Sequence, residues 1–413
     1  MSEAELLEFT GLKEKGISKV LPLTGDYAVA YAAKAADVDV VAAYPITPQT
    51  PIVERISKFI ADGEMNAELI NVESEHSALS ACIGASAVGA RVFTATSAQG
   101  LELMQEVLHI ASGMRLPIVM AIAARAVSAP VSIHGDYGDV MSMRETGWVI
   151  LIASNAQEAY DYVIQAFKIA ENPDVLLPVA VAFDGFLVSH VMEPVEIFDD
   201  EYVRKFIPKR RWPHVLNPKN PITMNATALP DSYYEIRYQV IHALNKAYGV
   251  IRDVMNQYNK YFNRDYTILN TYMIDDADYV IVAYGSIWGY IREVIDRVRK
   301  DGIKLGGVNF NVLRPLPTNE IVKYLSNVKA YAVVDKAFGY GAGGPVYADI
   351  ASVLKMHDIN VPSISATHGI GQRVMFINDF MYLVKELVKV GERGKSLDKV
   401  IHLGLRGWGE GHE

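Results

Sequence analysis

Short apolar runs that alternate with helical segments are the feature that most constrains the fold of this chain. In the first half of the sequence such runs occur at 38–43, 69–72, 92–96, 118–123, 149–153 and 177–183. Segments with helical character separate them at 51–62, 75–89, 101–112 and 156–171. Strands that are apolar along their whole length are typical of a parallel sheet covered by helices on both faces. The pattern therefore predicts a doubly wound α/β domain.

A second α/β unit is predicted from about residue 275 to 390. Its expected strands are 279–284, 307–313, 330–335 and 361–365, with a helix at 287–300. The composition changes between the two units, where prolines recur and a basic run stands at 209–211. This composition predicts an extended arm over 195–230 rather than a core element.

Apolar residues at helical spacing then predict a connecting helix over 231–265. With about 150 residues per domain, 413 residues are enough for two or three domains. We expect two: a first domain over 1–230, which includes the arm, and a second over 266–413.

One cysteine and an acidic charge balance exclude several classes of function. Cys82 alone cannot form an internal disulfide, a CxxC redox pair or a zinc site of thiolates, and four thiolates for an iron–sulfur cluster are not available. The 39 basic and 48 acidic residues give a net charge of −9, which argues against a nucleic-acid binder.

The first residues lack the apolar core of a signal peptide, and no apolar run of about 18 residues occurs. We therefore expect a cytoplasmic protein without a membrane span.

The carboxyl ends of the predicted strands are where open α/β sheets bind ligands. The first strand continues into residues 44–51, Tyr-Pro-Ile-Thr-Pro-Gln-Thr-Pro, whose prolines restrict the loop and the hydroxyl of Thr47. A rigid connection between strand and helix is the alternative interpretation. After the next strand, Glu75 opens a helix of small residues. It either complements the helix dipole or is a partly buried acid with a raised pKa, suited to proton transfer.

Two further strand ends carry polar candidates. Ser97 and Gln99 stand in the turn Thr-Ser-Ala-Gln-Gly, which either presents backbone N–H groups to a ligand or caps the next helix. Arg125 closes an apolar strand, where a guanidinium requires an anionic partner. A structural ion pair and a bound substrate carboxylate both satisfy that requirement.

Two glycine-containing loops allow additional interpretations. Residues 134–139, His-Gly-Asp-Tyr-Gly-Asp, could form a mobile active-site segment, although one His and two Asp give only a weak metal signature. Residues 339–344 fit G-x-G-x-x-G between a strand and a helix. They lack the acidic residue that closes a second strand about 20 residues later in a dinucleotide fingerprint.

Four of these segments are residues 44–48, 73–75, 96–100 and 124–126. They occur in the same order in the α subunits of 2-oxoacid:ferredoxin oxidoreductases, a family that this chain resembles. Matching motifs continue over nearly the whole chain at 144–148, 183–186, 189–190 and 313–317. The chain is most similar to the archaeal type of pyruvate:ferredoxin oxidoreductase.

The resemblance implies a thiamine diphosphate enzyme that is divided over several chains. The first domain would be its pyrimidine-binding domain, and the second would be similar to the transketolase C-terminal domain. A β subunit would bind the diphosphate and Mg²⁺ through a Gly-Asp-Gly…Asn signature that this sequence lacks. Iron–sulfur clusters would lie on partner chains, among which the resemblance implies γ and ferredoxin-like δ subunits. Coenzyme A would be a cosubstrate and ferredoxin the electron acceptor.

The resemblance also implies roles for individual residues. Glu75 corresponds to the catalytic glutamate that hydrogen-bonds N1′ of the cofactor's aminopyrimidine. Thr47 and Arg125 correspond to residues that bind the oxygens and the carboxylate of the 2-oxoacid. The implied cofactor-binding residues are Tyr44, Pro45, Ile46, Glu75, Ser97 and Gln99. No metal ligand is assigned to this chain.

The leading hypothesis is therefore a subunit for the reversible, coenzyme A-dependent oxidative decarboxylation of pyruvate. Branched-chain 2-oxoacids and 2-oxoglutarate are alternative substrates, because the α subunits of those enzymes share the same loops. Two hypotheses of other classes stay open: a non-catalytic nucleotide-binding protein that uses residues 339–344, and a structural scaffold subunit.

Overall fold

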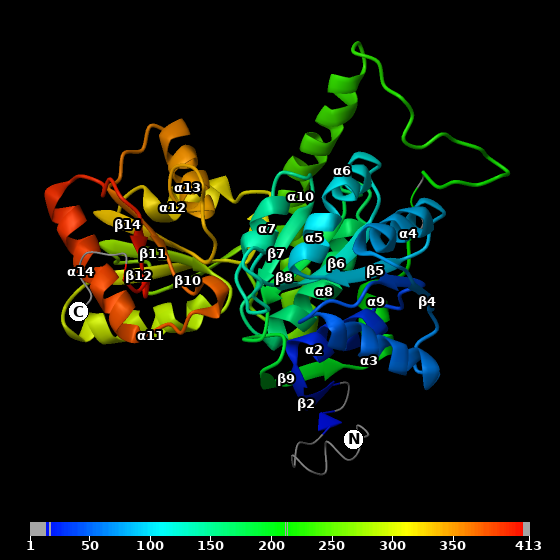
Figure 1. Cartoon of the computed structure of the whole chain (residues 1–413), viewed down its shortest axis with the longest axis horizontal. Helices are drawn as coiled ribbons and strands as arrows, with labels where there is room; N and C mark the ends of the chain where they lie inside the picture. The colour runs from blue at the N-terminus through cyan, green and yellow to red at the C-terminus, as the bar shows by residue number, and fades with distance from the viewer. Residues whose placement is uncertain (1–13, 16–17, 211, 213, 408–413) are drawn as a thin grey trace.

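The computed structural model has two lobes, each built around one β-sheet (Figure 1). It describes residues 14–15, 18–210, 212 and 214–407. A seven-stranded sheet in the first lobe has the order β13-β7-β8-β6-β5-β3-β4. A six-stranded sheet in the second has the order β10-β12-β11-β14-β15-β16. Both sheets are mostly parallel, so the predicted α/β class is confirmed.

The first sheet is covered on both faces, as its apolar strands require. Its parallel strands are β3 (Val40–Ala43), β4 (Glu68–Asn71), β5 (Val92–Thr96), β6 (Ile118–Ala124), β7 (Val149–Ala153) and β8 (Val179–Asp184). One face carries α2 (Gly25–Ala35), α3 (Thr50–Ala61) and α8 (Ala156–Ala170). The other carries α4 (Glu75–Ala87), α5 (Ala98–Leu103), α6 (Gln105–Gly113) and α7 (Gly138–Met143). Every residue of β5 to β8 is buried.

The second sheet repeats this architecture on a smaller scale. Its strands are β10 (Leu269–Tyr272), β11 (Tyr279–Tyr284), β12 (Leu305–Phe310), β14 (Ala330–Asp335), β15 (Ser363–Thr367) and β16 (Ile401–His402), with β10 antiparallel. One helix pair that packs on it is α11 (Ile287–Lys300) and α14 (Ile377–Arg393). The other is α12 (Thr318–Leu325) and α13 (Pro345–Met356), and a short 3₁₀ turn, η1, spans Ile370–Gln372. No helix in the part of the chain that the structure describes is long and apolar enough to cross a membrane.

One predicted strand divides between the two sheets. Instead of a single strand over 307–313, the chain forms β12 and then β13 (Val312–Arg314), which pairs antiparallel with β7 of the first sheet. Asn311 lies at the break and donates a hydrogen bond to the Thr267 carbonyl oxygen (2.8 Å). Because the run is buried in both sheets, its apolar pattern does not show where the chain changes sheet.

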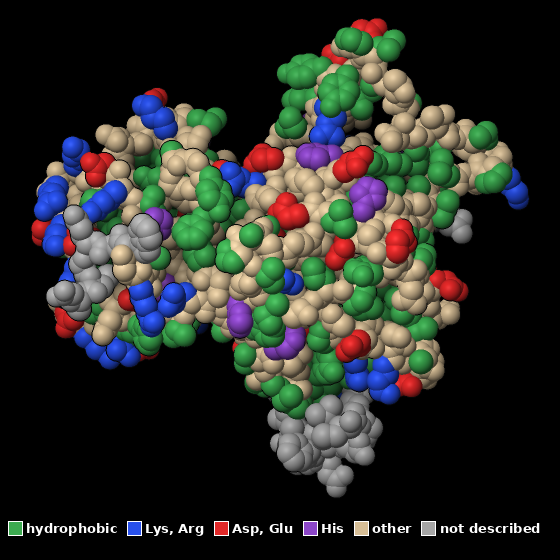
Figure 2. All heavy atoms as spheres, in the orientation of Figure 1, with side chains coloured by type: hydrophobic (Ala, Val, Ile, Leu, Met, Phe, Trp, Pro, Cys, Tyr) green, Lys and Arg blue, Asp and Glu red, His purple; other side chains and the backbone are tan. Residues whose placement is uncertain are grey.

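The segment predicted as an arm over 195–230 begins with regular structure. β9 (Met192–Phe198) pairs antiparallel with β2 (Ser18–Thr24) in a three-stranded sheet that also contains β1 (Glu14–Lys15), and α9 (Asp200–Phe206) follows. Prolines suggested an irregular segment, but β9 is an edge strand, and edge strands tolerate proline. The chain then projects from the body and returns through α10 (Tyr233–Phe262), inside the predicted range 231–265 (Figure 1). Exposed apolar side chains gather on this projection, among them those of Leu229, Tyr233 and Tyr234 (Figure 2).

Candidate active site

The predicted site residues follow four neighbouring strands of the first sheet. Residues 44–47 follow β3, Glu75 follows β4, Ser97 follows β5 and Arg125 follows β6. The strand order reverses at β3, since β4 lies on one side of it and β5 and β6 lie on the other. Such a switch point opens a crevice at the carboxyl ends of the strands, where ligands bind in this class of fold. The structure therefore brings the four segments together at one edge of the sheet.

Glu75 is the first residue of α4 and is buried, with 7% of its surface exposed. Ser74 is the N-cap and accepts a hydrogen bond from the Ser77 N–H, so the helix end is capped without the Glu75 side chain. Among the described residues, none forms a hydrogen bond with the Glu75 carboxylate. Its neighbour Glu73 is exposed and accepts a hydrogen bond from Ser77 Oγ (2.6 Å). The two carboxylates of this turn therefore have different environments.

Two further polar atoms without partners belong to residues 96–99, at the end of β5 and in the turn after it. Thr96 Oγ1 and Gln99 Nε2 are both buried and form no hydrogen bond. A Cβ placed on Gly100 would lie 2.7 Å from Glu75 Oε1 and 2.6 Å from Thr96 Oγ1, so a larger residue here would displace these side chains. Buried polar groups are normally paired, so unpaired ones require an explanation such as a catalytic or binding role. The Ser97 hydroxyl is already committed, because it donates to the Ala123 carbonyl oxygen (2.7 Å).

Arg125 and Thr47 are in direct contact. Arg125 Nη1 donates to the Thr47 carbonyl oxygen (2.7 Å), and its Nε donates to the Ser132 carbonyl oxygen (2.8 Å). The Arg125 side chain is buried, and burial lowers its pKa, while Asp139 acts in the opposite direction. Among the described residues no carboxylate lies within 4.0 Å of its guanidinium nitrogens, so the structural ion pair that the sequence allowed does not form there. The N–H groups of Arg125 that these two bonds do not use can donate to a bound carboxylate.

Gln49 is a buried polar residue of the loop after β3 that the sequence analysis did not single out. It is fully buried, its Nε2 donates to the Ala95 carbonyl oxygen (3.0 Å), and its Oε1 accepts from the Ile46 N–H (3.2 Å). These bonds attach the loop after β3 to the end of β5. Tyr44, Pro45 and Thr47 remain exposed on that loop. The only sequence signal for Gln49 is its position between the prolines of the loop.

The loop over 134–139 is fixed between the two lobes rather than free. Asp136 accepts hydrogen bonds from the N–H groups of Gly138 (2.9 Å) and Gly371 (3.1 Å). His134 is exposed and its ring packs against Phe186. In the described part of the chain, no three or more His, Cys, Asp and Glu side chains are arranged to bind a metal. Asp139, at the end of this loop, is fully buried, which raises its pKa to about 8 although three backbone N–H groups donate to it.

The glycine-rich turn over 339–344 precedes α13, but a carboxylate already occupies the helix N-terminus. Asp335, the last residue of β14, accepts hydrogen bonds from the N–H groups of Val346 (2.9 Å) and Tyr347 (3.2 Å). A dinucleotide fold uses such N–H groups to bind a pyrophosphate. Asp335 already accepts these N–H groups, so they are not available to a pyrophosphate. The geometry therefore does not favour nucleotide binding at this turn.

Comparisons with known proteins identify the family of the chain. Residues 31–256 match the family described as "Pyruvate flavodoxin/ferredoxin oxidoreductase, thiamine diP-bdg", and residues 277–380 match "Pyruvate:ferredoxin oxidoreductase core domain II". The chain belongs to the pyruvate:ferredoxin oxidoreductase family. The resemblance inferred from the sequence motifs is confirmed.

Two curated members of the pyruvate:ferredoxin oxidoreductase family illustrate the range of names among its relatives. Pyruvate synthase subunit PorA of Methanocaldococcus jannaschii is 45% identical over 94% of this chain and 98% of its own length. Ketoisovalerate oxidoreductase subunit VorA of Pyrococcus horikoshii is 44% identical over 93% of this chain and 97% of its own length. The identities do not separate the two substrate classes.

Solved structures support the fold of this family member. A 2-oxoglutarate:ferredoxin oxidoreductase from Magnetococcus marinus superposes with a TM-score of 0.68 and 18% identity, over 89% of this chain and 65% of that chain. A split-gene transketolase superposes with a TM-score of 0.53 and 14% identity, over 90% of this chain and 99% of that chain. At these identities the likeness concerns the fold alone. It confirms the predicted similarity to thiamine diphosphate enzymes and transketolase.

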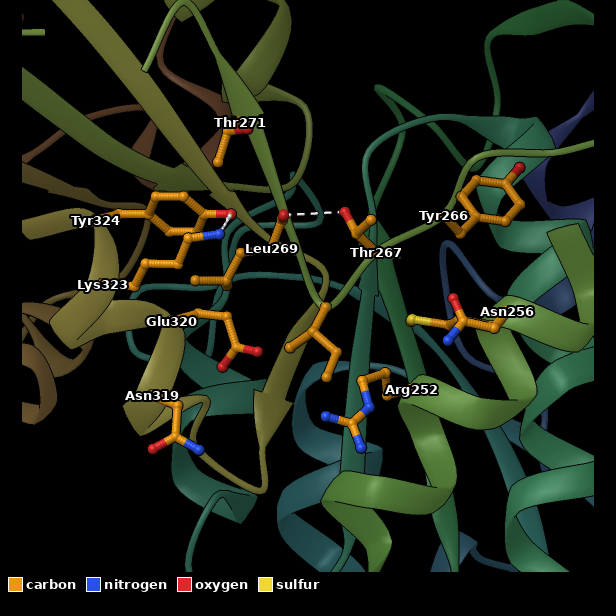
Figure 3. A pocket seen from close by; sticks show the side chains of 12 residues that line it. Arg252, Asn256, Tyr266, Thr267, Leu269, Thr271, Asn319, Glu320, Lys323 and Tyr324 are labelled. Atoms are coloured by element: carbon orange, nitrogen blue, oxygen red, sulfur yellow. Dashed lines mark hydrogen bonds between the residues drawn. The ribbon is translucent and has the colours of Figure 1, made fainter. Parts of the chain in front are cut away.

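Two cavities lie outside the cluster around Glu75. One of about 830 Å³ separates residues 126–130, directly after Arg125, from the turn over 339–344. The other, of about 380 Å³, lies between α10 and α12, with Arg252 and Lys323 among the residues that line it (Figure 3). None of the predicted site residues lines this smaller cavity. It is therefore separate from the candidate active site of this family member.

Proposed function

We propose that the chain is the α subunit of a pyruvate:ferredoxin oxidoreductase. The enzyme would convert pyruvate, coenzyme A and oxidised ferredoxin into acetyl-coenzyme A, CO₂ and reduced ferredoxin, and the reaction would be reversible. The buried Glu75 carboxylate, which has no hydrogen-bonding partner among the described residues and lies at the switch point of the first sheet, is the observation that carries the proposal. Membership of the family and the pyruvate synthase name of the PorA relative support it.

The residues around Glu75 fit the aminopyrimidine half of thiamine diphosphate. When bound, this cofactor supplies a nucleophilic carbon that adds to the 2-oxo group and takes up the electron pair released with CO₂. Glu75 would hydrogen-bond N1′ of the ring and hold the proton at that nitrogen, as a positioned carboxyl group can. The unpaired Thr96 Oγ1 and Gln99 Nε2 would hydrogen-bond the polar edge of the ring. Tyr44, Pro45 and Ile46 would contact the cofactor from the loop after β3.

Arg125 and Thr47 would orient the 2-oxoacid. The planar guanidinium can form paired hydrogen bonds with a carboxylate, which a point charge such as lysine cannot reproduce. Its bond to the Thr47 carbonyl oxygen fixes the direction in which the guanidinium extends. The Thr47 side chain is exposed at the same loop and would donate its hydroxyl to a substrate oxygen.

The proposal assigns the remaining chemistry to partner subunits. Cys82 is the only cysteine of the chain; it is fully buried, and burial raises its pKa to about 12. A thiol that is neutral at physiological pH binds iron poorly, and a cluster needs several thiolates. The iron–sulfur clusters would therefore lie on other chains, with ferredoxin-like δ and γ subunits among them. A β subunit would bind the diphosphate and Mg²⁺ and complete the site around Glu75.

Branched-chain 2-oxoacids are the second candidate substrates. The 44% identity to a ketoisovalerate oxidoreductase subunit, almost equal to that of the pyruvate synthase subunit, favours this alternative. The two proposals share the roles of Glu75 and Arg125 and differ only in the side chain of the 2-oxoacid.

The test is a purified complex that contains this chain and its native partners. Viologen reduction with coenzyme A would be measured for pyruvate, 3-methyl-2-oxobutanoate and 2-oxoglutarate, and bound iron and thiamine diphosphate would be quantified. We expect the highest kcat/KM with pyruvate and iron in partner chains alone. A higher kcat/KM with the branched-chain acid would move the assignment to the second candidate. No turnover of any 2-oxoacid by an intact complex would contradict both.

A further inference from the structure

Asp139 joins two of the loops that form the candidate active site. It lies in the first turn of α7 and is fully buried. Its Oδ2 accepts hydrogen bonds from the Ala98 N–H (2.8 Å) and from the Arg125 N–H (3.0 Å), and its Oδ1 accepts from the Val140 N–H (2.7 Å). A single carboxylate oxygen therefore connects the turn after β5 to the turn after β6.

Both turns lie beyond the last paired residues of β5 and β6, so hydrogen bonds between these strands do not fix the distance between the turns. The pairing of β5 with β6 ends at Thr96 and Ile122, so the N–H groups of Ala98 and Arg125 receive no support from that ladder. Ala98 also adopts a left-handed backbone conformation, with φ of 44°, which is unfavourable for a residue with a Cβ. A conformation of this kind persists only when its surroundings stabilise it. The bond to Asp139 is such a stabilising contact.

Contacts from the second lobe fix the position of Asp139. The Tyr137 N–H donates to the Lys336 carbonyl oxygen (2.8 Å), and the Tyr137 ring packs edge-on against Tyr284 at 5.2 Å between centroids. The Tyr137 hydroxyl donates to Asp184, which also forms a buried ion pair with Lys336. Residues 135–139 therefore connect the second lobe to the loops of the first, and Asp139 is the residue of this connection that reaches them.

We propose that Asp139 is a positioning residue of the active site, which keeps the Ser97–Gly100 turn and Arg125 at the spacing that the cofactor and the substrate carboxylate require together. It touches neither ligand, and it acts through the backbone of Ala98 and Arg125. The inference rests on the proposed function for the identity of the two ligands. The contacts themselves concern this chain alone.

The test compares Asp139→Leu, which has a similar volume and no acceptor, with Asp139→Asn, which keeps one acceptor oxygen. Each variant is purified in the complete complex. The dissociation constant of thiamine diphosphate is measured by quenching of intrinsic fluorescence, and KM and kcat are measured for the 2-oxoacid that the wild type prefers. We expect Asp139→Leu to raise both the dissociation constant and KM at least tenfold. Asp139→Asn should raise each by a smaller factor than Asp139→Leu, because the amide oxygen can still accept from both the Ala98 and Arg125 N–H groups and only the bond from the Val140 N–H is lost.

Asp199→Leu is the matched control, since Asp199 also accepts two backbone N–H groups, those of Glu201 and Tyr202, but at the start of α9 and away from the connection between the lobes. It should lower Tm and leave the dissociation constant and KM unchanged. A lower Tm for Asp139→Leu with wild-type binding and KM would reduce Asp139 to a structural role and overturn the inference. Absence of cofactor binding and turnover in the wild-type complex would instead refute the proposed function.

Hydrogen exchange in the wild-type complex provides a test that needs no variant. The Ala98 and Arg125 amides should be protected as strongly as strand amides such as that of Thr94, because they are bonded to a buried acceptor. Exchange of either amide at the rate of an exposed loop would overturn the inference, even if Asp139→Leu does not assemble.

Discussion

Glu75 of the first lobe and Asp335 of the second are buried carboxylates near strand ends, and their environments are opposite. In the first lobe the Glu75 carboxylate has no hydrogen-bonding partner among the described residues, and Thr96 Oγ1 beside it is also unpaired. In the second lobe Asp335 accepts hydrogen bonds from two backbone N–H groups and from the Tyr284 hydroxyl. The sheets are alike, so the topology does not decide which one binds a ligand. The two carboxylates differ instead, because the acceptors of Asp335 are in use, whereas the described residues leave those of Glu75 open to a ligand.

Among substitutions that test this difference between the lobes, Gly100→Ala in the first lobe is expected to lower kcat/KM the most. The added Cβ would displace the Glu75 carboxylate and the Thr96 hydroxyl, which lie 2.7 and 2.6 Å from its position. Misplacement of a catalytic group by about 1 Å can cost about 100-fold in rate, and we expect a loss of that size in kcat/KM. Viologen reduction by the complex measures it. Gly84→Ala is the control, since its Cβ would meet nothing within 4 Å; equal activity of the two variants would contradict the packing argument.

A smaller effect is expected from Arg125→Lys, which replaces a planar fork by a point charge and removes the bond to Thr47. KM for the 2-oxoacid should rise about tenfold, with a lesser change in kcat, as expected when a contact to the substrate carboxylate is lost. Initial rates over a range of 2-oxoacid concentrations measure both constants. An unchanged KM would assign Arg125 a role in loop structure only.

The smallest effect is expected in the second lobe, from Asp335→Asn. Burial raises the pKa of Asp335 to about 7, so the folded chain keeps this proton up to about pH 7, whereas an unfolded chain releases it near pH 4. The stability that Asp335 contributes is therefore present below about pH 4 and is lost as the pH rises to about 7.

Asparagine does not titrate, so Tm of the Asp335→Asn variant should fall less between pH 5 and pH 8 than Tm of the wild type. Scanning calorimetry of the complex at the two pH values gives the comparison, and KM should not change. Equal pH dependence in both proteins would show that Asp335 does not titrate in this range.

The sequence predicted which segments the structure brings together at one edge of the first sheet, because each of them follows a strand, whereas the roles of their residues stay predictions. Glu75 and Arg125 are found by position alone once the strands are recognised. Gln49 and Asp139 were not assigned, because their partners are backbone groups 46 and 41 residues away, at Ala95 and Ala98. Such contacts leave no pattern in the chain. The sequence also did not predict that β13 pairs with the first sheet, because an apolar run has the same pattern in either sheet.

The central claim is that the buried carboxylate of the Glu73–Ser74–Glu75 turn performs proton chemistry and the exposed one does not. The direct test is kcat of the complex at saturating cofactor and 2-oxoacid for Glu75→Gln and Glu73→Gln, with cofactor content measured in each. We predict that Glu75→Gln lowers kcat about 100-fold or more in an assembled complex, since a positioned acid–base group contributes about 100- to 10,000-fold. Glu73→Gln should keep wild-type kcat. A Glu75→Gln complex that retains more than half of the wild-type kcat would contradict the account.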